Sequence, residues 1–413
     1  MPGRIRMLDA VNRTMQRLGY LKLLCELVNQ TETSNLATLG RRLIDRVTRR
    51  VPLSPPFDEQ VREYARTRLT DRTYQNLRKA ILEGTSETVS LEIQDFYLAD
   101  PTIPSSTGKL VEANWRRYPY LGTALDLVRK GTYSALTRSL VLLAVTPQEE
   151  LDAFVELDRQ HNPMRLSDAQ ALVFLYCLLD NDAEVLVPLY RRLLALPTCP
   201  FDERVAGDML PEILRSAIQD HRKRGVTAEE RERLAILAKS ATSIEKKGGK
   251  AYTGGSAREE AIRVRLEPYC DLGFLAKPDR DRYEYQSTEA LRMFVSQMEG
   301  ASSTDAFLQE RFFTAFAAAR GLTTTAADDA DATQALAQAG QALKSSLGYS
   351  PITDVGLLAG IRLLVEKGRV LELGRATELL KALQKQDPGF VRFTVDRMGN
   401  MAYVKFLKGA PGG

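Results

Sequence analysis

The alternation of apolar and polar residues is clearest near the C-terminus, in residues 352–408. Two helices are predicted there, because apolar residues recur every three or four positions in each of them. Their inward faces are Val355, Leu358, Ile361 and Val365 in the first helix, and Ala376, Leu379, Leu380 and Leu383 in the second. A short apolar strand, Val370 to Leu373, is predicted between them.

A predicted hairpin follows the second helix. Asp387-Pro388-Gly389 ends the helix, because proline cannot continue it and favours an extended residue before it. Two β-rich runs then flank residues 396–400, where Gly399 suits the positive φ of a tight turn. The region therefore reads as helix, short strand, helix and hairpin.

Residues 257–288 repeat the last part of that order. A helix is predicted from a cap at Ser256, with Ile262, Leu266 and Tyr269 facing inward. The helix ends in CDLGFLAK at positions 270–277, and a turn and a short alternating strand follow.

Both regions resemble the winged-helix fold. CDLGFLAK is similar to the phrase, roughly LVDLGLLEK, with which the third helix of many winged-helix proteins ends before the wing. The resemblance implies a helix that enters the DNA major groove and a hairpin that contacts backbone phosphate. The C-terminal region departs from the family pattern, since only one helix separates its first strand from the hairpin where the usual fold has two.

The remaining sequence is largely helical, so we predict a mainly α, multidomain protein with small β-hairpins and two or more winged-helix-like modules. Residues 246–256 are glycine-rich and are expected to form a flexible joint, and residues 323–331 an exposed linker. The predicted divisions are 1–100 (helical, with a pattern that could form a further winged helix), 110–200 (helical), 201–300 (helical plus a winged-helix-like module), 301–350 (alanine-rich helices and linker) and 351–408 (C-terminal winged-helix-like module).

Composition limits which ligands and which cellular compartment are expected for the protein. Its 57 basic and 53 acidic residues give a net charge of +4, so any nucleic-acid-binding surface has to be local. Apolar runs such as 140–145 are too short to span a bilayer, and the basic N-terminus lacks the apolar segment of a secretory signal. The four cysteines lie far apart and form no CxxC pair, and most of them are predicted to be core residues of a reduced, cytoplasmic protein.

Motifs for metal or nucleotide chemistry are missing. The two histidines, His161 and His221, are predicted at helix ends, the latter in solvent, and are too few for the common zinc sites. Gly108-Lys109 and Gly249-Lys250 lack both the first glycine and the following Ser or Thr of a phosphate-binding loop.

Acidic clusters give no better case for catalysis. Glu245-Lys246-Lys247 has a spacing seen in metal-dependent nucleases, but it is predicted at a helix end. Asp328, Asp329 and Asp331 are predicted to be helix caps. We therefore expect no enzymatic activity, no cofactor and no metal.

Basic clusters on the predicted helices and hairpins remain as candidate chemistry, although such charges are often only a solvated helix face. The candidate DNA-binding residues are Arg258, Arg263, Arg265, Lys277, Arg280 and Arg282 in the first module, Arg375, Lys381, Lys385, Arg392, Arg397 and Lys405 in the C-terminal module, and Arg41, Arg42 and Arg46 near the N-terminus.

The sequence thus predicts a non-catalytic DNA-binding subunit that provides recognition or a scaffold in a larger bacterial DNA-targeting assembly, such as one for phage defence or chromosome maintenance. Double-stranded DNA and other protein subunits are the expected partners, and a membrane is not. A transcriptional regulator is one alternative, and a protein–protein adaptor whose winged helices never contact DNA is another. The DNA sequence, the protein partners and the oligomeric state, homo-oligomer included, stay open.

Overall fold

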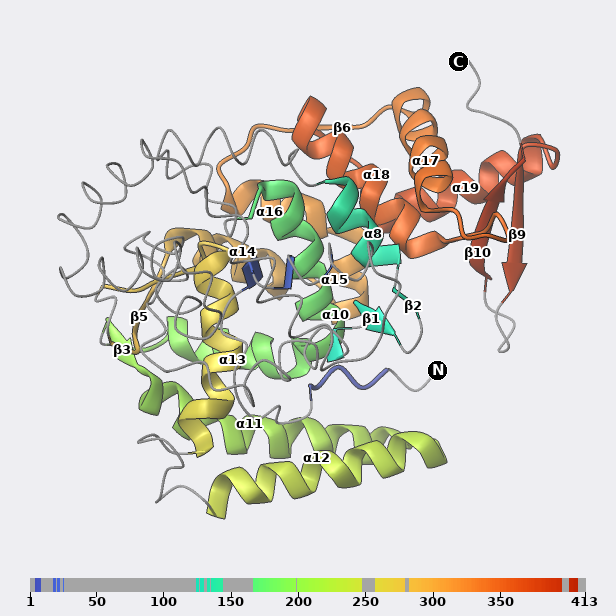
Figure 1. Ribbon diagram of the computed structural model, residues 1–413. Helices are drawn as coiled ribbons and strands as arrows, with labels where there is room; N and C mark the ends of the chain where they lie inside the picture. The colour runs from blue at the N-terminus through green and yellow to red at the C-terminus, as the bar shows by residue number, and fades with distance from the viewer. Residues whose placement is uncertain are drawn as a thin grey trace, which may run out of the picture. The chain divides into compact units, whose positions relative to one another are not determined.

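The structure is a computed structural model that describes residues 4–8, 18–19, 21–22, 25, 124–125, 127–129, 132–133, 135–143, 166–197, 199–246, 257–278, 282–395 and 401–407 (Figure 1). The described part is mainly α-helical with small β-sheets, as predicted. Most of the predicted N-terminal helices, the loop before residue 110 and residues 247–256 lie outside it. Within the described residues, no helix combines the length and the apolar character that crossing a membrane requires.

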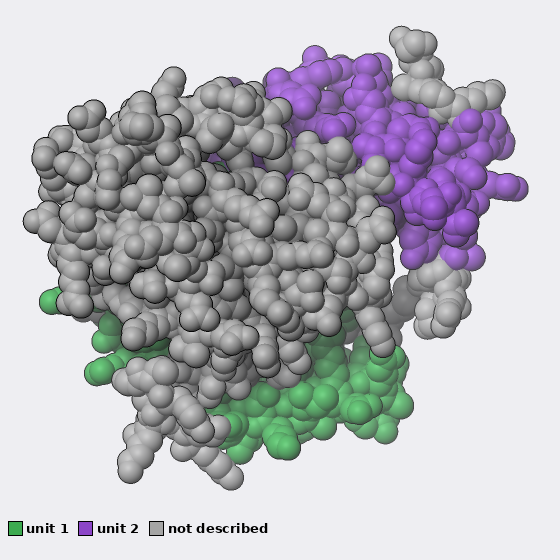
Figure 2. All heavy atoms as spheres, viewed as in Figure 1, with its two compact units in different colours: residues 1–133, 144–166, 178–288 green, residues 134–143, 167–177, 289–413 purple. Residues whose placement is uncertain are grey.

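The chain divides into two compact units, coloured separately in Figure 2. Unit 1 comprises residues 1–133, 144–166 and 178–288, and unit 2 comprises residues 134–143, 167–177 and 289–413. Helix α10 (Asp168–Leu194) contributes residues to both units. The predicted divisions 110–200 and 201–300 each contain residues of both units.

Unit 1 is a set of helices with two small antiparallel sheets. Its elements, besides the second part of α10, are β1 (Val128–Arg129), β2 (Thr132–Tyr133), β3 (Phe201–Asp202), α11 (Glu203–Arg224), α12 (Ala228–Lys246), α13 (Ala257–Asp271), β4 (Leu275–Ala276) and β5 (Glu284–Ser287). Strand β1 pairs with β2, and the other sheet has the order β3-β5-β4, so that β3 pairs with β5.

Local sequence explains where these helices begin and end. The Asp202 carboxylate accepts hydrogen bonds from the backbone N–H groups of Arg204 and Val205 and so caps α11. Thr227 and Glu230 form a reciprocal capping box at the start of α12. The chain leaves α13 through Gly273, whose φ of 71° falls in the left-handed region that glycine adopts freely.

Unit 2 contains the C-terminal helices and a second small sheet. Its elements, besides the first part of α10, are α8 (Ala135–Leu142), α14 (Glu289–Glu299), α15 (Thr304–Glu310), α16 (Phe312–Ala319), β6 (Thr325–Ala326), α17 (Asp329–Leu343), β7 (Ser350–Pro351), α18 (Ile352–Lys367), β8 (Arg369–Val370), α19 (Leu373–Gln386), β9 (Val391–Val395) and β10 (Met401–Phe406). The sheet order is β7-β10-β9, and β6 pairs in parallel with β8.

One hydrophobic core runs through α17, α18, α19 and the hairpin of unit 2. Leu336 of α17, Leu358 of α18, Leu380 of α19 and Val404 of β10 are all fully buried in it. Residues 329–343 and 352–406 therefore share one core, although the sequence suggested a division at residue 350. Figure 1 shows the β9–β10 hairpin beside α19 at the end of this unit.

The predicted C-terminal helices are confirmed as α18 and α19. Val355, Leu358 and Ile361 are buried as expected, but Val365 is 48% exposed, although Leu364 before it is buried. The predicted strand is shorter than expected, and it pairs with β6 instead of the hairpin.

The strand that pairs with the hairpin is β7, which lies before α18. Two helices, α18 and α19, with the two-residue β8 between them, therefore separate β7 from the hairpin. The sequence pattern missed β7 because it is only the two residues Ser350-Pro351, and proline is a poor strand signal.

Candidate nucleic-acid interface

Helix α13, which precedes the β4–β5 strand pair, lies in the interior of unit 1. Ile262, Leu266 and Tyr269 are buried, as the sequence predicted. Arg265 and Glu267 are also buried, with 3% and 0% of their surface exposed. Because buried residues occur on several sides of α13, the helix offers little free surface to a DNA groove.

Arg265 forms a buried ion pair with Asp182 of α10. Its guanidinium donates to the Asp182 carboxylate at 2.7 and 3.2 Å, to the carbonyl of Ala261 at 3.1 Å and to the carbonyl of Leu8 at 3.2 Å. Burial raises the pKa of Asp182 from 3.8 to about 6, although the Arg265 charge opposes this shift. These bonds leave the Arg265 side chain enclosed.

Arg263 and Arg258 are also engaged within unit 1. Arg263 donates two hydrogen bonds to Glu203 and stacks over the Tyr283 ring at 3.6 Å from its centroid. Burial raises the pKa of Glu203, against the opposing effect of the Arg263 guanidinium. Arg258 pairs with Asp208 at 2.7 Å, and 27% of its side chain is exposed.

Lys277 belongs to a second buried cluster, at the base of the hairpin of unit 1. Its ammonium group lies 3.2 Å from the Glu267 carboxylate, and 1% of its side chain is exposed. The Tyr285 hydroxyl donates to the same carboxylate, and the Lys277 ammonium also lies over the Tyr283 ring. Arg282 pairs at the surface with Glu284 at 3.7 Å.

These positions correct the expectation that Arg265 and Lys277 face DNA. A phosphate cannot approach a guanidinium or ammonium group that is buried and already bonded to a carboxylate. The sequence did not reveal the pairing with Asp182, which is 83 residues from Arg265. The nearest signal was the acidic run Asp180-Asn181-Asp182-Ala183-Glu184 within an otherwise apolar helix.

The C-terminal module distributes its charges differently. Ala376, Leu379 and Leu380 bury one face of α19, and Lys381 and Lys385 are exposed one turn apart away from it. In β9, Val391 is buried and Arg392 is exposed, as expected for alternation along a strand. The exposed face of α19 and the first hairpin strand thus both carry basic groups.

Lys381, Lys385 and Arg392 have no ion-pair partner among the described residues. Arg375, at the start of α19, pairs instead with Asp329 at 2.8 Å and Glu378 at 3.7 Å. These four residues are the C-terminal candidates on α19 and β9.

The other candidates are engaged at the edge of the sheet or lie outside the described residues. Lys405 is half-buried, with its ammonium over the Tyr349 ring and 3.5 Å from the Leu347 carbonyl. The candidates that lie outside the described residues are Arg41, Arg42, Arg46, Arg280 and Arg397.

The acidic cluster lies at the start of α17, where Asp328 is the predicted helix cap and Asp329 and Asp331 lie in the first turn. The Asp328 carboxylate caps α17 through the backbone N–H of Asp331 at 2.8 Å. Arg369 donates to both of these aspartates, and Lys367 pairs with Asp331 at 2.8 Å. The cluster thereby ties the start of α17 to the end of α18 and to β8.

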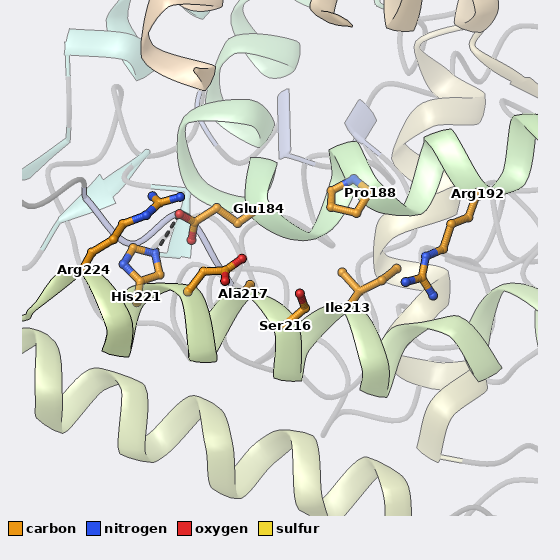
Figure 3. A pocket seen from close by; sticks show the side chains of 9 residues that line it. Glu184, Pro188, Arg192, Ile213, Ser216, Ala217, His221 and Arg224 are labelled. Carbon is orange, nitrogen blue, oxygen red and sulfur yellow. Dashed lines mark hydrogen bonds and ion pairs between the residues drawn. The ribbon is translucent and has the colours of Figure 1, made fainter. Parts of the chain in front are cut away.

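A pocket of about 200 Å³ lies between α10 and α11 in unit 1 (Figure 3). His221 contacts Glu184 there at 2.7 Å and is only 3% exposed, so the prediction of a solvated His221 was wrong. Of the described residues that line the pocket, Ser216 carries the one hydroxyl, and no hydrogen bond joins it to His221. The lining therefore shows no nucleophile bonded to a general base.

Comparison with known proteins identifies no family for this chain. No protein-family model, no curated protein sequence and no solved structure matches the chain.

Proposed function

We propose that the protein is a non-catalytic, duplex-DNA-binding recognition or scaffold subunit of a larger DNA-targeting assembly, and that it binds DNA through a winged helix formed by residues 329–406. The observation that supports this proposal is the element order α17, β7, α18, β8, α19, β9, β10 together with the sheet order β7-β10-β9, in which the two-residue β8 takes no part because it pairs with β6. Apart from β8, this order resembles that of a winged helix, in which α19 would be the third helix and the β9–β10 hairpin the wing.

The unpaired cations of this module support DNA as the ligand. Lys381 and Lys385 stand on the exposed side of α19, where a third helix would meet the major groove. Arg392 stands on the first strand of the wing, where it would meet a backbone phosphate. Because these groups have no carboxylate partner among the described residues, contact with phosphate breaks no ion pair seen in the structure.

A salt titration of duplex affinity tests the proposal. The full-length triple variant K381A/K385A/R392A is compared with wild type on a random-sequence duplex of about 20 base pairs. Removing one cation that neutralises a phosphate reduces the slope of log K against log salt by about 0.9, so the slope should flatten by roughly 2 to 3. Affinity should fall to a similar degree on every sequence if the three residues contact only phosphate.

The matched control removes the same charge from unit 1. R222A/R224A/K239A replaces three exposed cations that have no ion-pair partner among the described residues, and it should leave the slope unchanged. Wild-type affinity and slope in a folded K381A/K385A/R392A variant would refute DNA binding by α19. One strongly preferred sequence would instead favour a transcriptional regulator.

A protein–protein adaptor is the second candidate, and the wing itself favours it. Val395 and Met401 are cross-strand partners and are 55% and 43% exposed, while Tyr403 is 42% exposed. Exposed apolar neighbours of this kind are common at protein interfaces. Absence of DNA binding by wild type, with loss of a co-purifying protein in M401D/Y403D, would support the adaptor.

A further inference from the structure

The segment Arg4–Leu8 is bound by side chains from three helices of unit 1. Ile5 and Met7 are 3% and 0% exposed, and Arg6 between them is 8% exposed, so the middle of the segment is buried. Arg4 and Arg6 both pair with Asp180 of α10, at 2.7 and 3.4 Å. Basic and apolar residues thus alternate from Arg4 to Met7.

The backbone of the segment is also recognised. The N–H of Arg6 donates to the Glu184 carboxylate at 3.0 Å, and the carbonyl of Arg6 accepts from the Glu184 N–H at 3.1 Å. The N–H of Leu8 donates to Asp182 at 2.8 Å. The carbonyls of Met7 and Leu8 accept from Arg233 of α12 and Arg265 of α13, each at 3.2 Å.

A break in α10 makes this recognition possible. Asp182 has φ of −139° and ψ of 15°, which is not helical, and the helix is kinked there. The Glu184 N–H, two residues later, bonds to Arg6 instead of continuing the ladder of the helix. The kink also places carboxylates of Asp180, Asp182 and Glu184 where each contacts the segment.

Main-chain hydrogen bonds combined with pockets for alternate side chains are one of the ways in which proteins bind peptides. We propose that the kinked part of α10, with Arg233 of α12 and Arg265 of α13, is a peptide-binding site. Its ligand is a segment in which basic and apolar residues alternate, and residues 4–8 of this chain occupy it in cis.

The site borders the pocket between α10 and α11, because Glu184 belongs to both. One Glu184 oxygen accepts from Arg6, and the other contacts His221 in the pocket of Figure 3. Replacing Glu184 should therefore weaken the peptide and disturb the pocket together, whereas replacing Arg192 at the other end of the pocket should leave peptide binding unchanged.

Complementation in trans tests the proposal. The full-length variant Met7→Asp places a charge at a fully buried position and should dislodge the cis segment. A fluorescein-labelled peptide with the sequence of residues 2–10 should then bind M7D about 100-fold more tightly than wild type. Wild type should bind the labelled peptide weakly, because its own residues 4–8 compete for the site at an effective concentration on the order of millimolar.

Two comparisons decide the outcome. A labelled peptide that itself carries Met7→Asp should not bind M7D. If this peptide and the wild-type peptide bind M7D equally well, the proposal is overturned. It is also overturned if the wild-type peptide does not bind folded M7D.

If M7D does not fold, the same question is put to wild type with a protease recognition sequence inserted after residue 10. After cleavage, excess unlabelled peptide should displace the cut segment, and a segment that stays bound to the folded protein under 100-fold excess peptide would also overturn the proposal.

Discussion

The interior position of Arg265 makes a prediction opposite to that of a DNA-contacting arginine. Arg265→Ala removes four hydrogen bonds, two of which go to the Asp182 carboxylate. Asp182 has 1% of its side chain exposed, so water cannot replace the missing guanidinium without opening the structure. Breaking a buried ion pair by removal of one partner costs about 3–5 kcal/mol, and we expect a loss of unfolding free energy in that range.

Equilibrium urea unfolding at pH 7, followed by circular dichroism, measures this loss. Arg192→Ala is the matched control, because Arg192 makes two hydrogen bonds of 2.8 Å to Glu212 at the surface of the same unit. An exposed pair contributes only about 0–1 kcal/mol, so the control should be close to wild type. A second substitution, Asp182→Asn in the Arg265→Ala background, should recover part of the loss because it removes the uncompensated charge.

The pH dependence of Arg265→Ala gives an independent check. The Arg265 charge lowers the pKa of Asp182, so in the variant this pKa should rise above its present value of about 6. At pH 5 the Asp182 carboxyl group of the variant is then neutral. The unfolding free energy of Arg265→Ala should therefore be closer to that of wild type at pH 5 than at pH 7. A loss below about 1 kcal/mol at pH 7, equal to that of Arg192→Ala, would refute a structural role for Arg265 and return it to the DNA-binding candidates.

Three further predictions concern single positions and are measured by urea unfolding. The folded-state pKa of Asp182 is raised, so the stability gained by protonating this carboxyl group is complete below about pH 4 and is lost as pH rises through 6. Asp182→Asn should therefore remove a pH dependence of the unfolding free energy on the order of 3 kcal/mol. An unchanged pH profile in this variant would contradict the prediction. In Gly360→Ala the new Cβ would lie 2.5 Å from the Phe313 ring and 2.9 Å from the Leu371 carbonyl oxygen, so we expect a loss of about 1–3 kcal/mol in spite of the better helix propensity of alanine. Equal or higher stability would contradict the close packing of α18 against these groups. Glu372 accepts hydrogen bonds from the N–H and hydroxyl of Thr314 at the start of α16. Glu372→Ala should therefore lower the unfolding free energy by about 1–2 kcal/mol, and Glu372→Gln should lower it by less. Equal losses in the two variants would exclude a capping role for Glu372.

The helices of the fold could be predicted because their signals are local. Apolar spacing located α18 and α19, and the Asp387-Pro388-Gly389 stop agrees with the end of α19 at Gln386. The two-residue strands could not be placed in the same way. Strand β7 is defined by its pairing with Tyr403 and Val404, some fifty residues later, and Ser350-Pro351 carries no strand pattern of its own.

The candidate interface was less predictable than the fold, because a basic residue on a helix does not show whether a carboxylate will meet it. The acidic partners of Arg263 and Arg265 are 60 and 83 residues away, so no helical spacing could reveal them. The exposed positions of Lys381 and Lys385 did follow from the pattern, since Ala376, Leu379 and Leu380 define the opposite, buried face.

The two units contain sheets of the same strand order, but the helices before their hairpins differ in number and in surroundings. Three helices, α11, α12 and α13, lie between β3 and β4 in unit 1, and two, α18 and α19, lie between β7 and β9 in unit 2. In unit 1 the helix before the hairpin is α13, and carboxylates supplied by α10, α11 and α13 itself engage its cations and those of the following hairpin. In unit 2 the helix before the hairpin is α19, and Asp329 of α17 reaches only its first turn, at Arg375. The placement of acidic side chains therefore distinguishes α13, whose cations are engaged within its unit, from α19, and under the proposed function it is on α19 and β9 that removing charge should weaken DNA binding.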